Sequence, residues 1–167
     1  MNKIAKFVVT LVPKLAIVPV KLMPKAIQEK AAALIVNHVL AEQLADDELE
    51  FLSGKWLEIK VSDLQQSWYF TLAEGRHEEN PAISASVSPQ NADVSIVGNV
   101  NTFSLLCAQS VDPDTLFFRR QLSIEGNTEL GLAVKNMLDT VELDNVPVLA
   151  KSLMTKYSNL ITASQTA

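Results

Sequence analysis

Residues 116–141, LFFRRQLSIEGNTELGLAVKNMLDTV, decide the fold that we expect for this chain. Leu122 and Ile124 alternate with polar residues, which is the period of a half-buried strand, and Gly126 follows where that strand should stop. Asn127 suits a helix N-cap because its side chain can accept a hydrogen bond from a free backbone amide. Apolar residues then recur at helical steps: Leu130, Val134, Met137, Leu138 and Val141. The stretch therefore predicts a strand, a tight turn and an amphipathic helix that folds back onto a sheet.

The same two periodicities predict the rest of the fold. Alternating apolar and polar residues indicate four earlier strands, at residues 57–61, 68–72, 83–87 and 94–98. Helical spacing indicates further helices, at residues 25–45, 102–107 and 145–160. Pro113 is expected in the loop before the fifth strand, which would carry Arg119 and Arg120 with their side chains on opposite faces. The order of elements predicts an α+β layer, with helices covering one face of a five-stranded sheet.

Charge is spread unevenly along the 167 residues, which suffice for one domain with extensions. Residues 1–26 form a basic apolar leader with five lysines and no acidic residue. The rest of the chain has nine basic and 19 acidic residues, which argues against nucleic acid as a partner. A basic apolar leader on an acidic body is typical of contact with an anionic membrane surface. The prolines and lysines interrupt the leader too often for it to span a bilayer.

The residues that would carry catalysis or bind a cofactor are missing from the sequence. One cysteine, Cys107, and two distant histidines, His38 and His77, argue against zinc, haem or iron–sulfur binding. The five glycines form no phosphate loop, and no serine lies in a nucleophile elbow. We therefore expect a binding protein without cofactor or metal, rather than an enzyme. A catalytic site near Arg120, Glu125 and His77 is the remaining enzymatic alternative.

The run SIEGNTELGL resembles the sterol carrier protein type-2 family of lipid carriers. The runs PDTLFFRRQLSIEGNTELGLAVKNMLDTVEL, DDELEFLSGKWLEIKVSDL and VPVKLMP are more similar to one branch of it, the accessory factors of ubiquinone biosynthesis. Two departures from the wider family are Asn127, where Asp is frequent, and Arg119 with Arg120, where Gly-Lys is usual. The resemblance implies a five-stranded, mainly antiparallel sheet covered by helices, with an apolar lipid tunnel between the layers.

By this resemblance, residues 27–143 form the lipid-binding domain, and residues 144–167 form a C-terminal helix, which could act as a lid, and a polar tail. The expected lipid-binding residues are Leu57, Ile59, Trp68, Phe70, Phe103, Leu106, Phe118, Leu122, Leu132, Met137, Leu149, Leu153 and Met154. The implied function is that of a non-catalytic accessory factor for oxygen-independent ubiquinone biosynthesis. It would hold a polyprenylated quinone precursor or a phospholipid for two hydroxylases, UbiU and UbiV, in the cytoplasm at the inner membrane. The alternative is a scaffold protein of a ubiquinone biosynthesis complex without a role in lipid transfer.

Two features keep alternative interpretations open. The leader, through Lys3, Lys6, Phe7, Leu11 and Lys14, either lies in the membrane interface or packs on the domain or a partner. For Arg119 and Arg120 there are two interpretations. In the first, one of them binds a lipid headgroup at the tunnel mouth. In the second, one is solvated and the other packs the stem of its side chain on apolar surface.

Overall fold

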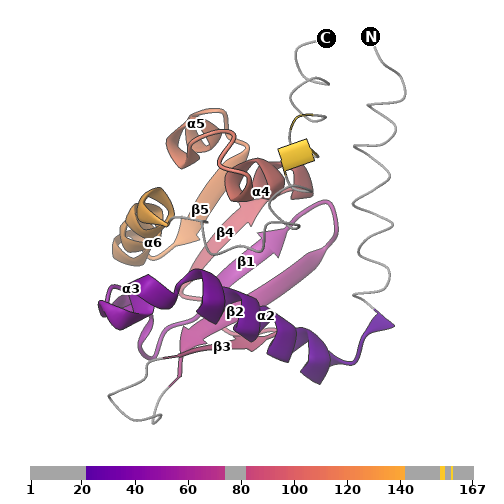
Figure 1. Cartoon of the computed structure of the whole chain (residues 1–167), viewed down its shortest axis with the longest axis vertical. Helices are drawn as coiled ribbons and strands as arrows, with labels where there is room; N and C mark the ends of the chain where they lie inside the picture. Colours follow the sequence, from indigo (N-terminus) through magenta and orange to yellow (C-terminus); the bar gives the residue numbers. More distant parts are fainter. Residues whose placement is uncertain (1–21, 74–81, 142–154, 157–158, 160–167) are drawn as a thin grey trace.

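The computed structural model describes residues 22–73, 82–141, 155, 156 and 159. In this part of the chain a layer of helices lies on one face of a five-stranded sheet (Figure 1), so the expected α+β class is confirmed. None of the described helices has both the length and the apolar character that crossing a bilayer requires.

The strands and helices follow one another closely along the chain. The strands are β1 (Leu57–Val61), β2 (Gln66–Leu72), β3 (Ile83–Ser86), β4 (Val94–Gly98) and β5 (Leu122–Gly126). The helices are α2 (Lys25–Val39), α3 (Ala41–Ala45), the short 3₁₀ helix η1 (Glu50–Leu52), α4 (Val100–Cys107), α5 (Pro113–Phe118) and α6 (Thr128–Thr140). The predicted helix over residues 25–45 is thus two helices, α2 and α3.

The sheet is mixed, with the strand order β3-β2-β1-β4-β5. Three neighbouring pairs are antiparallel, but β1 and β4 run parallel at the centre, where Leu57 lies opposite Val94. The expectation of a mainly antiparallel sheet is corrected in this respect. The reason is topological: β2 and β3 extend the sheet on one side of β1, so the chain must cross over before β4 can pair with the other side.

One face of the sheet is apolar and lies under the helices. Leu57, Phe70 and Ile96 point to this side and are at most 5% exposed. Beside β5 the space above the sheet is filled, since Leu122 is 1% and Leu116 is 0% exposed. Because side chains alternate across each strand, the intervening residues must face the other way.

The opposite face of the sheet is polar and centres on Glu58. Its carboxylate accepts hydrogen bonds from the hydroxyls of Ser67 (2.7 Å), Ser95 (2.7 Å) and Tyr69 (3.2 Å). Burial would raise the pKa of Glu58, but these hydroxyls and the nearby Lys60 ammonium outweigh it and hold the pKa below the ordinary 4.5. Burial and the same carboxylate raise the pKa of Tyr69. This ionised, hydrogen-bonded network makes this face polar, and the described helices pack on the other one.

The segment before β5 differs from its prediction. Residues Pro113–Phe118 form helix α5, so the expected loop and early start of the fifth strand are wrong. The Asp112 side chain accepts a hydrogen bond from the Thr115 amide (2.9 Å), and Pro113 occupies the first turn, where its missing N–H costs nothing. Arg119 and Arg120 consequently lie in the turn between α5 and β5, not on a strand, and both are exposed.

The predicted N-cap of α6 is confirmed, because the Asn127 side chain accepts a hydrogen bond from the Leu130 amide at 3.1 Å. The cap of α4 is Asn99, whose side chain accepts from the Thr102 amide at 2.8 Å. The helix predicted over residues 102–107 thus begins two residues earlier, at Val100. Both helices therefore begin directly after a strand, and because β4 and β5 are antiparallel, α4 and α6 start at opposite ends of this pair.

Side chains of α2 fasten this helix to the edge strand β3. The Asn37 amide donates to the Ile83 carbonyl (2.8 Å) and accepts from the Ile83 amide (2.7 Å). Two turns earlier, the Glu29 carboxylate accepts from the Ser86 hydroxyl (3.2 Å) and the Val87 amide (3.0 Å). The helix thus satisfies backbone groups at the edge of the sheet and lies along that edge.

Replacing Asn37 by leucine should lower the free energy of unfolding by about 1–3 kcal/mol, because the Ile83 N–H and C=O lose their partners. Urea denaturation measures this change. Lys30→Leu, on the exposed side of the same helix, is the matched control and should alter stability by less than about 0.5 kcal/mol. Equal stabilities of the two variants would contradict this role of Asn37.

Candidate functional site

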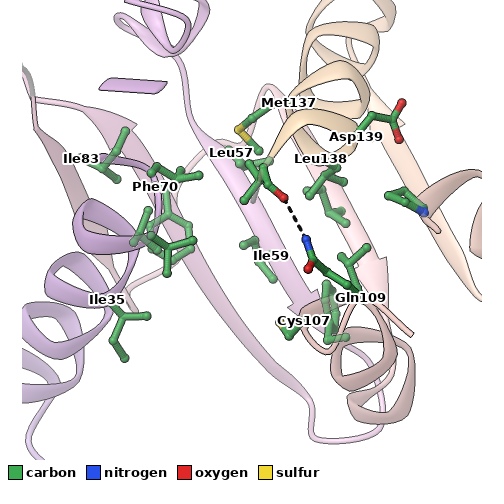
Figure 2. A pocket seen from close by; sticks show the side chains of 18 of the residues that line it. Ile35, Leu57, Ile59, Phe70, Ile83, Cys107, Gln109, Met137, Leu138 and Asp139 are labelled. Atoms are coloured by element: carbon green, nitrogen blue, oxygen red, sulfur yellow. Dashed lines mark hydrogen bonds between the residues drawn. The ribbon is translucent and has the colours of Figure 1, made fainter. Parts of the chain in front are cut away.

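A cavity of about 910 Å³ lies between the apolar face of the sheet and the helices. Its floor includes Leu57, Ile59 and Phe70, while Ile35 of α2 and Met137 of α6 lie on opposite sides of it (Figure 2). The volume falls within the roughly 300–1,000 Å³ typical of small-molecule sites. The cavity is therefore large enough to hold much of an apolar ligand.

The placement of the two long helices explains the open space. Asn37 holds α2 at the β3 edge, whereas α6 packs against β5 at the opposite edge. The central strands between them contribute Leu57, Ile59 and Ile96 to the cavity floor. Apolar walls do not hold water well, so a hydrocarbon ligand gains about 25 cal/mol for each Å² of surface that it removes from water.

A few polar residues form one rim of the cavity, where α4 ends and α5 and α6 approach each other. Gln109, with a left-handed backbone (φ 50°), donates from its side chain to the Val141 carbonyl at 3.4 Å. Asp112 and Asp139 also line this rim. Hydrogen bonds from Thr115 lower the pKa of Asp112. The rim thus offers side-chain oxygens beside an otherwise apolar space.

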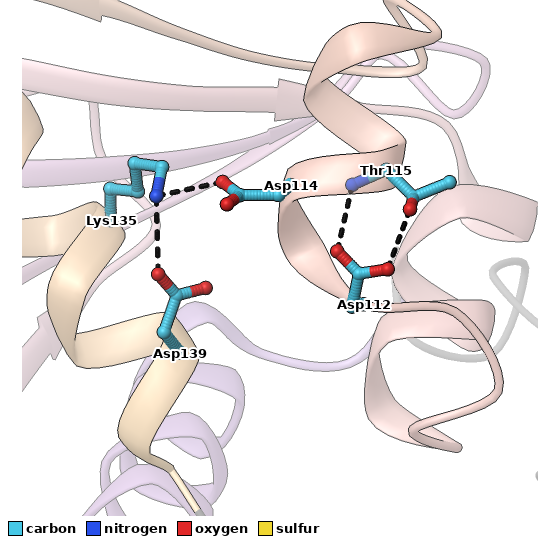
Figure 3. Close-up of polar contacts among 5 residues, drawn as sticks. All are labelled: Asp112, Asp114, Thr115, Lys135 and Asp139. Atoms are coloured by element: carbon cyan, nitrogen blue, oxygen red, sulfur yellow. Dashed lines mark hydrogen bonds and ion pairs between the residues drawn. The ribbon is translucent and has the colours of Figure 1, made fainter.

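An ion-pair bridge joins α5 to α6 at the same rim. The Lys135 ammonium lies 2.7 Å from the Asp114 carboxylate and 3.2 Å from that of Asp139 (Figure 3). Hydrogen bonds to these two carboxylates raise the pKa of Lys135. Because the groups are exposed to solvent, the bridge contributes little to stability, but it connects the two helices.

The cavity lining carries no activated nucleophile among the described residues. Burial raises the pKa of the Cys107 thiol, so it remains protonated. In the same part of the chain, no group of His, Cys, Asp and Glu side chains could hold a metal ion. The apolar lining suits the holding of an apolar molecule.

The structure brings six of the predicted lipid-binding residues together around the cavity: Leu57, Ile59, Phe70, Phe103, Leu106 and Met137. Four others do not line it. Trp68 packs against the hydrophobic core, and Leu122 is buried beside Gly98 of the neighbouring strand. Phe118 (87% exposed) and Leu132 (59%) are exposed on α5 and α6.

The remaining predicted residues fall into two groups. Outside the described residues lie Leu149, Leu153, Met154, Lys3, Lys6, Phe7, Leu11, Lys14 and His77. Arg119 and Arg120 are described and exposed, but neither lines the cavity. The suggested headgroup contact at the cavity mouth stays a prediction.

Sequence reasoning missed the contribution of α2 and of Gln109 to the cavity. Leu34 and Ile35 line it, although they are 63% and 64% exposed. The available signal was the apolar character of α2 on more than one side, which exceeds what a single packing face needs. Gln109 gave no local signal, because its side-chain partner Val141 is 32 residues away.

Comparison with known proteins agrees with this geometry. The sequence profile of the SCP-2 sterol transfer family matches residues 36–139. The "Ubiquinone biosynthesis accessory factor UbiT" of Escherichia coli K12 is 36% identical over 163 residues, covering 98% of this chain and 90% of that protein. The solved structure of a "UbiJ-SCP2 Ubiquinone synthesis protein" has a TM-score of 0.52 at 16% identity, covering 71% of this chain and 98% of that chain. The resemblance inferred from the sequence motifs is thereby confirmed.

Met137→Trp should weaken binding of a fluorescent fatty acid by roughly tenfold or more, because the larger ring would occupy space that an apolar ligand needs. The free energy of unfolding should change by less than about 1 kcal/mol, since the ring enters a cavity and not a filled core. Fluorescence titration and urea denaturation measure the two effects.

Leu132→Trp, on the exposed side of the same helix, is the control and should change neither quantity. Two results would show that the cavity is not open space. One is normal binding of the probe by Met137→Trp. The other is a free energy of unfolding lowered by about 1–3 kcal/mol, which is typical of an overpacked core.

Proposed function

The chain belongs to the SCP-2 sterol transfer family, within its UbiT group, and from this premise we propose that it is a lipid-binding accessory factor of ubiquinone biosynthesis. The observation that carries the proposal is the apolar cavity of about 910 Å³ between sheet and helices. A relative of 36% identity across nearly the whole chain, named as such an accessory factor, supports the choice of pathway.

The cargo in this proposal is a polyprenylated quinone precursor or a phospholipid. Either has a long hydrocarbon tail, whose exposure to water costs about 0.8 kcal/mol per CH₂ group. Leu57, Ile59 and Phe70 on the cavity floor would remove part of the tail from water. Bound in this way, the head ring of a precursor becomes accessible to enzymes that do not enter the membrane.

The protein itself is non-catalytic in this scheme and needs no cofactor. It serves the oxygen-independent route and presents the precursor to the hydroxylases UbiU and UbiV. It works in the cytoplasm, peripherally associated with the inner membrane. The leader makes the membrane contact through Lys3, Lys6, Phe7, Leu11 and Lys14, and the segment with Leu149, Leu153 and Met154 acts as a lid over the cargo.

Protein purified from anaerobically grown cells should contain bound lipid, detectable by native mass spectrometry and identifiable after extraction. Ile59→Glu should remove at least about nine-tenths of it, because an ionised carboxylate on the cavity floor cannot be solvated beside a hydrocarbon tail. Circular dichroism checks that the variant is folded.

Val97→Glu is the matched control, since Val97 lies on the polar face of the neighbouring strand β4, and it should retain the lipid. A wild-type protein that never carries lipid would refute the carrier proposal. If Met137→Trp lost its lipid but still captured UbiU and UbiV as well as the wild type, the scaffold alternative would gain support.

A chain lacking residues 1–25 should bind vesicles of anionic phospholipid less tightly than the full chain, because it loses five lysines. Added salt should weaken binding of the full chain, since screening reduces the attraction. Vesicle sedimentation measures both effects. Equal binding by the two chains would rule out anchoring by the leader.

A further inference from the structure

The turn between α5 and β5 exposes an aromatic ring next to two positive charges. Phe118, the last residue of α5, is 87% exposed, the highest value among the large hydrophobic residues described. Arg119 and Arg120 follow directly and are also exposed. Neither guanidinium has a hydrogen-bond or ion-pair partner among the described residues. We call these three residues the Phe-Arg-Arg turn.

The backbone of this turn is one in which glycine would be preferred. The Arg120 amide donates to the Phe117 carbonyl (2.9 Å) and the Gln121 amide to the Leu116 carbonyl (3.0 Å), which is the Schellman pattern that closes a helix. That pattern requires a left-handed residue, and Arg120 adopts it with φ 56°. An arginine there is strained, whereas glycine would not be.

The charge of the turn contrasts with that of the protein, whose net charge is −5. The other cation near α5, Lys135, is already bridged to Asp114 and Asp139. Arg119 and Arg120 therefore form a local positive site on an acidic body. An anionic partner would approach this turn more favourably than the surface around it.

We propose that the Phe-Arg-Arg turn is a contact site for anionic phospholipid bilayers. Arginine side chains hydrogen-bond lipid phosphates. An aromatic ring beside them can enter the interface between the headgroups and the acyl chains. Phe118 and the two arginines provide this combination in consecutive positions.

The shape of the site favours a lipid surface over a protein partner. A single exposed turn offers little area for a protein interface, but it needs only one ring to enter a bilayer. The turn also lies close to the cavity: Pro113, at the other end of the six-residue α5, lines it, and the helix is only about 9 Å long. The choice of lipid rests on the proposed carrier function, since a cavity next to the membrane shortens the path of the cargo.

The test uses the full chain and vesicles of phosphatidylglycerol and phosphatidylcholine. Arg119→Gln combined with Arg120→Gln should weaken binding about 25-fold, at about fivefold per arginine. Phe118→Ser should weaken it about tenfold. Lys60→Gln, which removes an exposed cation from the polar sheet face, is the charge control and should leave binding unchanged. Vesicles of phosphatidylcholine alone should not distinguish the arginine variant from the wild type.

Arg120→Gly separates binding from folding. This variant should raise the melting temperature by about 2–4 °C, because the strain is relieved, and still bind the vesicles about fivefold less tightly. Gln65→Gly, at another exposed left-handed position (φ 50°), should also stabilise the fold but leave binding unchanged.

Normal vesicle binding by Arg120→Gly and by Phe118→Ser would overturn the proposal. So would equal losses on anionic and neutral vesicles in the arginine variant, or capture of a protein that alone accounts for membrane association. Lipid recovered from the same preparations tests the carrier function separately. A variant that loses vesicle binding but keeps its lipid supports the contact site, whereas a wild type that binds vesicles but never carries lipid refutes only the carrier.

Discussion

The contact between the Asn37 side chain and the backbone of Ile83 determines how the layers of this protein are arranged. A helix with apolar residues on several sides would gain most by lying over the centre of the sheet, where it could bury them. Its bonds to β3 hold α2 at the edge, and Glu29 reinforces them with bonds to Ser86 and Val87. These hydrogen bonds have a fixed geometry, whereas hydrophobic burial is non-directional, so they favour one position of α2 beside the cavity.

The two faces of the sheet differ in polarity. Hydroxyls around Glu58 satisfy its carboxylate on one face, and the described helices lie on the other (Figure 1). There the floor of the cavity is apolar, and paired charges at the rim connect α5 to α6. Lys135 is paired with Asp114 and Asp139, so it places no unpaired charge near a hydrocarbon ligand.

Local signals in the sequence were sufficient for much of the fold. The N-cap at Asn127 and the alternation in β1, β4 and β5 depend on neighbouring residues, and they were predicted. Helix α5 was missed because Leu-Phe-Phe is typical of strands, although Asp112 and Pro113 carried a helix-start signal. The cavity could not be predicted from periodicity, because a stripe that lines a space and a stripe that fills a core have the same spacing. Asn37 finds its partner 46 residues away, beyond any local pattern.

Cys107 has a chemical consequence for a protein proposed to carry quinone precursors. Quinone rings are electrophiles, and a thiolate beside one would add to it and form a stable thioether. Only the thiolate is a competent nucleophile, and burial keeps this thiol protonated by raising its pKa. An oxidised ring that reached this wall of the cavity would meet a weakly reactive S–H group, and the cargo could leave again without becoming covalently attached to its carrier.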